Sequence, residues 1–421
     1  MAVPNQRGAQ TFHRVIRAVT LLVAAAACTA PAPESLASPS PTFSPTPTPI
    51  LTLPSPTPAG TAAPIVGVTI AATGPLRGDL AWVVRRTAVA LPGSGRPGRY
   101  ELVVVPLTGG EPRVAVMWEL SGSFVGPGAP APAARQQLSP DGRRFAFATE
   151  SRRIVVVDLE TGAARQITND PEYQDDEPVW SRDGSKLAFR RARGGLEGGI
   201  WSVNADGTGA RRIVIGDPQR VSGGQPVYDW TPDGEVVCYG EPIDQYRCVR
   251  TADASLFTVV QNVSGLAPAD WRTASPRLVS AFSQRGAGTA LLVAEEPRSP
   301  GSSRTIATGR AADVEYLSPR WHPTADEVVY VEARTSVPAG RLGPLLGLFV
   351  STLDGTRRAL GTQGSPREPE WVPAGDEVVF LGRESGASAV DVGLFATRSD
   401  GSLFRTLWLA TDLVSLATRR Y

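Results

Sequence analysis

The sequence predicts an all-β fold in which about seven four-stranded sheets repeat around a closed ring. Three observations support this prediction. The chain contains 43 glycines and 38 prolines in 421 residues, a composition that favours short strands and tight turns over long helices. A turn motif ending in Asp-Gly or a close variant recurs along the chain. A short apolar run rich in strand-forming residues follows each copy.

The repeated unit can be followed from strand to strand. After the turn motif and its apolar run, each clear unit continues with a second strand. An acidic-glycine turn such as Asp206-Gly207 then leads to a closing strand of basic and apolar residues. These dipeptides are typical of hairpins because glycine accepts a positive φ without strain. Two degenerate copies, 80–84 and 268–271, bring the number of units to seven. The five clear copies begin at Leu138, Trp180, Trp230, Trp321 and Trp371.

The arithmetic of the repeat favours seven units over the alternative of six. The 357 residues from 65 to 421 give 51 residues per unit for seven and about 60 for six, whereas propeller blades typically have roughly 40–50. Stacking in a ring would cover both faces of each sheet, so we predict a β-propeller. We expect the recurring tryptophans to pack between blades and the turn aspartates to shape the turns. Either 412–421 or 65–71 would supply the closing strand.

Two segments precede the predicted propeller domain of residues 65–421. Residues 1–28 have a basic start, an apolar stretch too short to span a bilayer, and small residues before Cys28, as in a signal peptide. Residues 29–64 carry eleven prolines among Thr, Ser and Ala, and we expect a disordered, extended stalk. The end of the signal resembles a bacterial lipobox, although Ala25 replaces its usual leucine. Lipidation of Cys28 would anchor an exported lipoprotein; the alternative is ordinary cleavage and free secretion.

The other two cysteines, Cys238 and Cys248, lie in two apolar runs that flank a short loop. If the two runs pair as a hairpin, the midpoint between the cysteines falls at Ile243 in that loop. The cysteines would then be directly opposed, close enough for a disulfide after small adjustment. We predict this disulfide, with two buried free thiols as the alternative.

The repeats resemble those of a known family. The segment from Trp180 to Phe189, followed by 200–207, is similar to the WD40-like repeat of TolB-type propellers. Arg182 departs from the family's proline, and Leu138 replaces tryptophan in the second unit. Similar repeats occur in the propeller portions of prolyl-oligopeptidase-type peptidases. The resemblance implies the fold, but propellers serve unrelated activities.

The composition and motifs argue against several functional classes. Without residues 1–28 the chain has 39 basic and 41 acidic residues, which is unlike a nucleic-acid binder. His322 is the single histidine of that mature chain and occupies a turn position, so a metal site or a histidine-based catalytic pair is not expected. No G-x-S-x-G elbow occurs. We therefore predict neither an enzyme nor a cofactor or metal site.

Charged connections between blades provide the candidate binding site. The connections into the inner strand of each blade should meet at the mouth of the central channel, and in TolB that face receives a partner's peptide. We therefore predict a monomeric module of the cell envelope that binds a protein or peptide there. The alternatives are a solvated loop, or a carbohydrate-active or other small-molecule enzyme that uses paired carboxylates in the channel. The predicted rim residues are Asp175, Asp176, Glu177, Gln225, Glu315, Ser318, Arg367 and Glu368.

Overall fold

The computed structural model describes most of the chain from residue 65 onward. The predicted signal peptide, Cys28 and the stalk lie outside the described residues, and so does Gln225. The described ranges are 65–88, 98–120, 134–193, 197–215, 228–241, 245–253, 255–261, 264–266, 270–272, 275, 277–284, 288–294, 303–308, 314–336, 341–360, 365–383 and 391–419.

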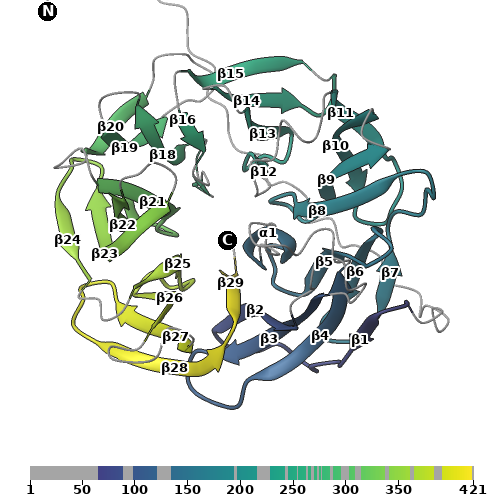
Figure 1. Ribbon diagram of the computed structural model, residues 1–421, viewed down its shortest axis with the longest axis horizontal. Coiled ribbons are helices and arrows are strands. Elements are labelled where there is room, and N and C mark those ends of the chain that lie inside the picture. The colour runs from purple at the N-terminus through teal and green to yellow at the C-terminus, as the bar shows by residue number, and fades with distance from the viewer. Residues whose placement is uncertain are drawn as a thin grey trace, which may run out of the picture. The chain divides into compact units, whose positions relative to one another are not determined.

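The strands form seven antiparallel sheets, which lie as blades around a central axis (Figure 1). The predicted seven-bladed β-propeller is therefore confirmed. Within a blade, consecutive strands pair from the axis outward, as expected for four-stranded meanders joined by short turns. The innermost strand of each blade ends at the rim that carries the Asp-Gly turns. We call this rim the turn face, and the opposite rim, where the inner strands begin, the channel-mouth face.

The first blade closes the ring with strands from both ends of the described chain. Its innermost strand is the C-terminal β29, which pairs with β2, and the N-terminal β1 adds a fifth strand outside β4. Both segments considered for closure thus join the same sheet. From the axis outward, its strands are β29 (Leu413–Thr418), β2 (Leu80–Ala88), β3 (Gly98–Pro106), β4 (Arg113–Leu120) and β1 (Val68–Ile70).

The second blade departs from the four-strand plan. Its sheet has β5 (Arg144–Ala148), β6 (Ile154–Asp158) and β7 (Ala164–Gln166). A single turn of helix, α1 (Ala134–Gln137), and one isolated bridge between Leu138 and Phe145 take the place of the inner strand. This is the unit in which leucine replaces the repeated tryptophan.

The remaining five blades follow the repeat closely, and in the fifth both β16 and β17 pair with β18. The third blade has β8 (Gln174–Trp180), β9 (Lys186–Arg193), β10 (Glu197–Asn204) and β11 (Arg211–Ile215), and the fourth has β12 (Tyr228–Trp230), β13 (Val236–Glu241), β14 (Gln245–Arg250) and β15 (Leu256–Gln261). The fifth has β16 (Ser264–Leu266), β17 (Asp270–Trp271), β18 (Leu278–Gln284), β19 (Gly288–Ala294) and β20 (Ser303–Thr308). The sixth has β21 (Val314–Trp321), β22 (Glu327–Ser336), β23 (Arg341–Thr352) and β24 (Arg357–Ala359), and the seventh has β25 (Arg367–Trp371), β26 (Glu377–Arg383), β27 (Asp391–Arg398) and β28 (Phe404–Thr411).

The hydrophobic core lies between the blades. Trp180 packs with Ala146 and Ile154 of the preceding blade, and Trp230 packs in the same way with Val179. The turns that follow the inner strands are built by hydrogen bonds of the repeated serine and aspartate. Ser181 donates to Asp183 (2.6 Å), while Gly184 adopts a φ of 68°, which only glycine accepts readily.

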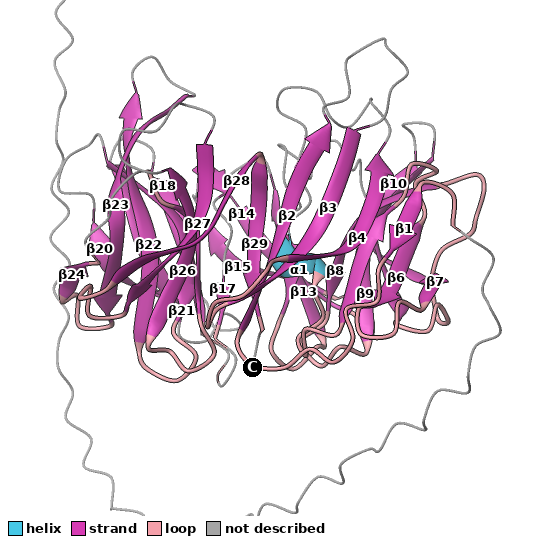
Figure 2. Ribbon diagram, turned by 90° about the horizontal axis from the view of Figure 1, so that it is seen from below, coloured by secondary structure: helices cyan, strands magenta, loops and turns pink. Residues whose placement is uncertain are grey.

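Cys238 and Cys248 are directly opposed on β13 and β14, fully buried, and joined by a disulfide. The side view shows that most of the described loops and turns gather along one rim (Figure 2). Within the described residues, no helix has the length and apolar character needed to cross a membrane.

Candidate functional site

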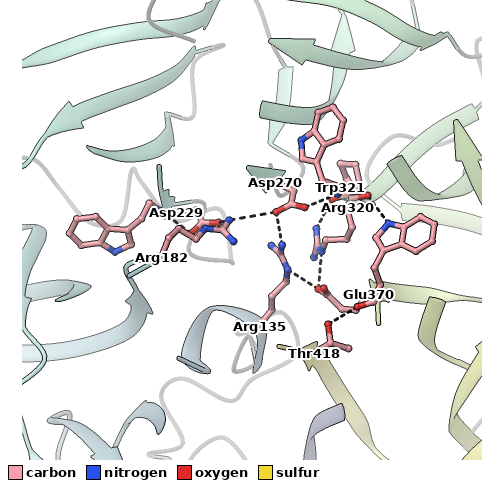
Figure 3. A network of polar contacts seen from close by, with 11 residues as sticks. Arg135, Arg182, Asp229, Asp270, Arg320, Trp321, Glu370 and Thr418 are labelled. Atoms are coloured by element: carbon pink, nitrogen blue, oxygen red, sulfur yellow. Dashed lines mark hydrogen bonds and ion pairs between the residues drawn. The ribbon is translucent and has the colours of Figure 1, made fainter. Parts of the chain in front are cut away.

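Six charged side chains, one from each of blades two to seven, meet near the axis of the ring (Figure 3). None of these side chains is more than 11% exposed. The first blade contributes Thr418, whose hydroxyl donates to the backbone carbonyl of Trp371 (2.8 Å). We call these charged residues the axial network: Arg135, Arg182, Asp229, Asp270, Arg320 and Glu370.

The axial network is one continuous chain of alternating charges. Arg182 joins Asp229 (3.0 Å) to Asp270 (3.6 Å), and Arg135 joins Asp270 (2.5 Å) to Glu370 (2.8 Å). Arg320 completes the chain on Glu370 (2.9 Å). Three guanidinium groups therefore balance three carboxylates, which is how buried charges are tolerated away from water.

The repeat places four of these charges. Asp229, Asp270, Arg320 and Glu370 each directly precede the repeated tryptophan of their blade. Neighbouring side chains of a strand point in opposite directions, so a tryptophan between blades directs the preceding side chain toward the axis. Sequence reasoning missed this set, although a charged residue before tryptophan in four units was a visible signal.

The network shifts the pKa values of two of its members, Asp270 and Arg135. Burial alone would raise the pKa of Asp270, but the guanidinium groups of Arg135, Arg182 and Arg320 outweigh it and lower the pKa to about 2. Burial would lower the pKa of Arg135, and the surrounding carboxylates raise it instead. Asp270 and Arg135 are therefore both charged at neutral pH.

Two of the predicted rim residues are engaged in bidentate ion pairs. Asp175 is fully buried and accepts from both Nε (2.6 Å) and Nη2 (2.8 Å) of Arg191, its neighbour across the sheet. Asp176 pairs in the same way with Arg190 (2.7 and 2.8 Å). The dense acidic cluster seen in the sequence is thus largely neutralised by arginines of β9, and these two carboxylates hold β8 on its neighbour.

Three other predicted rim residues occupy equivalent bulges in three blades. Glu177, Ser318 and Glu368 have φ values of 55°, 48° and 50°, and each directly precedes a proline. The register of the inner strand shifts at each of these positions. A left-handed conformation is uncommon for residues other than glycine, so the bulge is a strained feature that the fold repeats.

The remaining described rim residues lie on β21 and β25, two of the three strands that carry the bulges. Glu315 is partly buried on β21, opposite Ala333. Arg367 begins β25 and donates to the carbonyl of Leu413 (2.5 Å) on the closing strand β29. Arg367 therefore helps to join the last blade to the first.

The two bulge glutamates differ electrostatically from the axial network. Burial and the neighbouring Asp176 raise the pKa of Glu177 to about 7, because Arg190, 3.8 Å away, is shared with Asp176. Burial likewise raises the pKa of Glu368, and the opposing arginines only partly offset this. Both carboxylates would be stabilised by an additional positive charge.

His322 has a structural role in its turn. Its Nδ1 accepts hydrogen bonds from the backbone N–H groups of Thr324 (3.1 Å) and Ala325 (2.8 Å), so Nε2 carries the proton and donates to the carbonyl of Gly375 (2.9 Å). Burial lowers its pKa, which keeps the ring neutral. Among the described residues, no group of three metal-ligating side chains is placed to hold a metal ion.

Fold and site together define a seven-bladed β-propeller whose axis is closed by buried ion pairs. Neither a protein-family model nor a curated protein sequence matches the chain. TolB from Acinetobacter baumannii is among the similar solved structures, with 17% identity over 82% of this chain and 67% of that chain and a TM-score of 0.45.

Two peptidase structures share the fold more closely. These are an acylaminoacyl peptidase from Pyrococcus horikoshii (14% identity, 79% of this chain, TM-score 0.52) and a puromycin-hydrolyzing peptidase from Mycobacterium tuberculosis (14%, 81%, 0.52). This chain covers 51% and 53% of those two chains, about half of each. At such identities the likeness bears on the fold alone.

Proposed function

We propose that the protein is an exported, envelope-tethered module that binds a protein or peptide partner on the channel-mouth face. The observation that carries this proposal is the repeated bulge of Glu177, Ser318 and Glu368. Strained backbone persists only where the surrounding structure enforces it, and it concentrates at binding and catalytic sites. The same strained conformation recurs before a proline on the inner strands of three blades, which supports a shared role.

The charge at the bulges indicates what the partner presents. The raised pKa values of Glu177 and Glu368 show that the local positive charge does not fully compensate the two buried carboxylates. A lysine, arginine or terminal amine from a partner would supply that charge. The resulting charge-assisted hydrogen bond would strengthen as water is excluded. The bound segment is therefore basic.

Binding is favoured over catalysis by the state of the other polar groups. The carboxylates of the axial network are held by guanidinium groups, and both ring nitrogens of His322 are engaged in hydrogen bonds. General acid–base chemistry requires a group that can reach and exchange protons with a substrate. Using any of these groups would first require the ion pairs or the turn to break.

The test uses the full-length protein as immobilised bait for a bacterial envelope extract. We expect a partner that is captured by the wild type and lost from the double variant Glu177→Gln/Glu368→Gln, which removes both carboxylate charges. Asp354→Asn is the matched control, because Asp354 is a fully exposed turn carboxylate that bonds only within its own turn. Equal capture by the wild type and both variants would show that the bulges do not bind the partner.

The tether is tested separately. If Cys28 carries the lipid, Cys28→Ser should move the protein from the membrane fraction to the soluble fraction, with the propeller intact by circular dichroism. Continued membrane association of that variant would rule out lipidation as the anchor and leave the partner-binding proposal unaffected.

A further inference from the structure

A small cavity of about 50 Å³ lies between the axial network and the turn face. His322, Pro323 and Arg419 follow directly after the inner strands β21 and β29, so this end of the cavity lies toward the turn face. Its deep wall consists of residues already placed in the axial network, together with three of the repeated tryptophans. These deeper residues are Arg135, Arg182, Asp270, Trp271, Arg320, Trp321, Glu370 and Trp371.

The lining carries an excess of positive charge. It contains four guanidinium groups and two carboxylates, because Arg419 adds a cation while Asp229, the third carboxylate of the network, is not part of the wall. His322 adds no charge, since Nδ1 accepts two backbone hydrogen bonds. Because Arg182 is also paired with Asp229 (3.0 Å) just outside the wall, Arg419 is the lining cation that the network does not balance, and its charge favours an anion.

Most of the repeated tryptophans pair their indole N–H group with the backbone of the preceding blade. In three blades the indole N–H donates to a backbone carbonyl of the preceding blade: Trp180 to Gln137 (2.9 Å), Trp230 to Val179 (3.1 Å) and Trp371 to Arg320 (3.2 Å).

Trp271 and Trp321 break this pattern. They are 2% and 6% exposed, and their Nε1 atoms find no acceptor among the described residues. Both tryptophans line the cavity. A buried donor without an acceptor is costly, so the two missing bonds mark a place where an external acceptor would be stabilised.

We propose that this cavity binds a small carboxylate group. A carboxylate offers several acceptor positions on two oxygens and one negative charge, which matches a wall of guanidinium and indole donors. A volume of about 50 Å³ provides room for a group of roughly three or four heavy atoms. The site lies at the turn-face end of the axis and is independent of the partner surface proposed on the channel-mouth face. The bound carboxylate group belongs either to a free small molecule or to the C-terminus of a peptide.

The first experiment titrates the full-length protein with sodium formate against sodium chloride at constant ionic strength, followed by calorimetry and thermal unfolding. We expect saturable formate binding that chloride does not reproduce. Trp271→Phe and Trp321→Phe each remove one donor and should weaken formate binding about tenfold or more, as expected for a hydrogen bond to a charged group.

The matched control is Trp82→Phe. Trp82 is fully buried and its Nε1 also finds no acceptor among the described residues, but it does not line the cavity. Formate affinity should therefore change less than twofold in this variant. Should a tryptophan variant fail to fold, Arg419→Gln removes a partly exposed cation of the wall, with Arg99→Gln, which is exposed on β3, as its control.

A second arm identifies the source of the carboxylate. A short peptide with a free C-terminus that binds more tightly than formate, while its amidated twin does not bind, would assign the site to a chain terminus; formate binding alone would assign it to a free carboxylate. The proposal is overturned by absence of saturable binding of either probe, by an equal response to chloride, or by an equal loss in Trp82→Phe.

Discussion

Asp270 and Glu177 are two buried carboxylates on inner strands of the same ring, yet their pKa values move in opposite directions. Asp270 is held by Arg135 and Arg182, with Arg320 nearby, and its pKa falls to about 2. Glu177 shares Arg190 with Asp176, and its pKa rises to about 7. Burial raises the pKa of both, so the neighbouring charges decide the direction: three guanidinium groups outweigh burial at Asp270, whereas the carboxylate of Asp176 adds to it at Glu177.

This comparison separates two regions of the central axis. The axial network is balanced internally and stabilises the ring, whereas the bulges near the channel mouth retain uncompensated acidic character. Proximity to the mouth is not the cause, since Asp175 and Asp176 lie on the same part of β8 and are both held by bidentate arginines. The difference follows the register of β8 and β9, which places Arg191 opposite Asp175 and Arg190 opposite Asp176.

The largest expected effect comes from Asp270→Asn. This change removes the negative charge between Arg135 and Arg182 and should lower the free energy of unfolding by about 3–5 kcal/mol, the usual cost of breaking a buried ion pair. Urea unfolding measures it. Asp206→Asn, in an exposed turn, is the control and should change stability little. A loss below about 1 kcal/mol for Asp270→Asn would show that the network is not what holds the blades together.

The second prediction concerns pH. The folded-state pKa of Glu177 is raised from 4.5 to about 7, so its favourable contribution is complete below pH 4.5 and is lost as pH rises through 7. Glu177→Gln should therefore stabilise the protein above pH 7, on the order of 2–3 kcal/mol relative to the wild type, and leave it nearly unchanged at pH 4.

Asp270 provides the opposite sign for comparison. Its folded-state pKa is lowered from 3.8 to about 2, so its contribution is present above pH 3.8 and is lost as pH falls through 2. Stability measured from pH 2 to 9 should place the two effects in separate windows. An identical pH profile for the wild type and Glu177→Gln would mean that Glu177 titrates normally in the fold.

Much of the fold could be predicted from the sequence because turn chemistry repeats locally. The serine, aspartate and glycine of Ser181–Gly184 determine a turn within five residues, and the repeat length determines the number of blades. The helix α1 could not be predicted, because the second unit lacks the tryptophan and its inner strand is reduced to one bridge.

The candidate site was harder to predict because its members come from different blades. The sequence marks Glu177, Ser318 and Glu368 as charged or polar connections between blades, but their shared left-handed bulge depends on the pairing of each inner strand. The partners of Asp175 and Asp176 lie on β9, and nothing in a single sequence assigns Arg191 to one and Arg190 to the other without the register. The axial network could not be predicted without the closed ring, because its six residues come from six different blades.

The smallest expected effect compares two tryptophans that are both almost fully buried. The Nε1 of Trp180 donates to the carbonyl of Gln137, whereas that of Trp82 finds no acceptor among the described residues. Replacement of either by phenylalanine removes the same ring volume, but only Trp180→Phe also leaves a buried carbonyl unpaired. Trp180→Phe should therefore cost about 1 kcal/mol more than Trp82→Phe in urea unfolding. Equal losses would show that packing between blades, and not pairing of polar groups, sets the contribution of the repeated tryptophans.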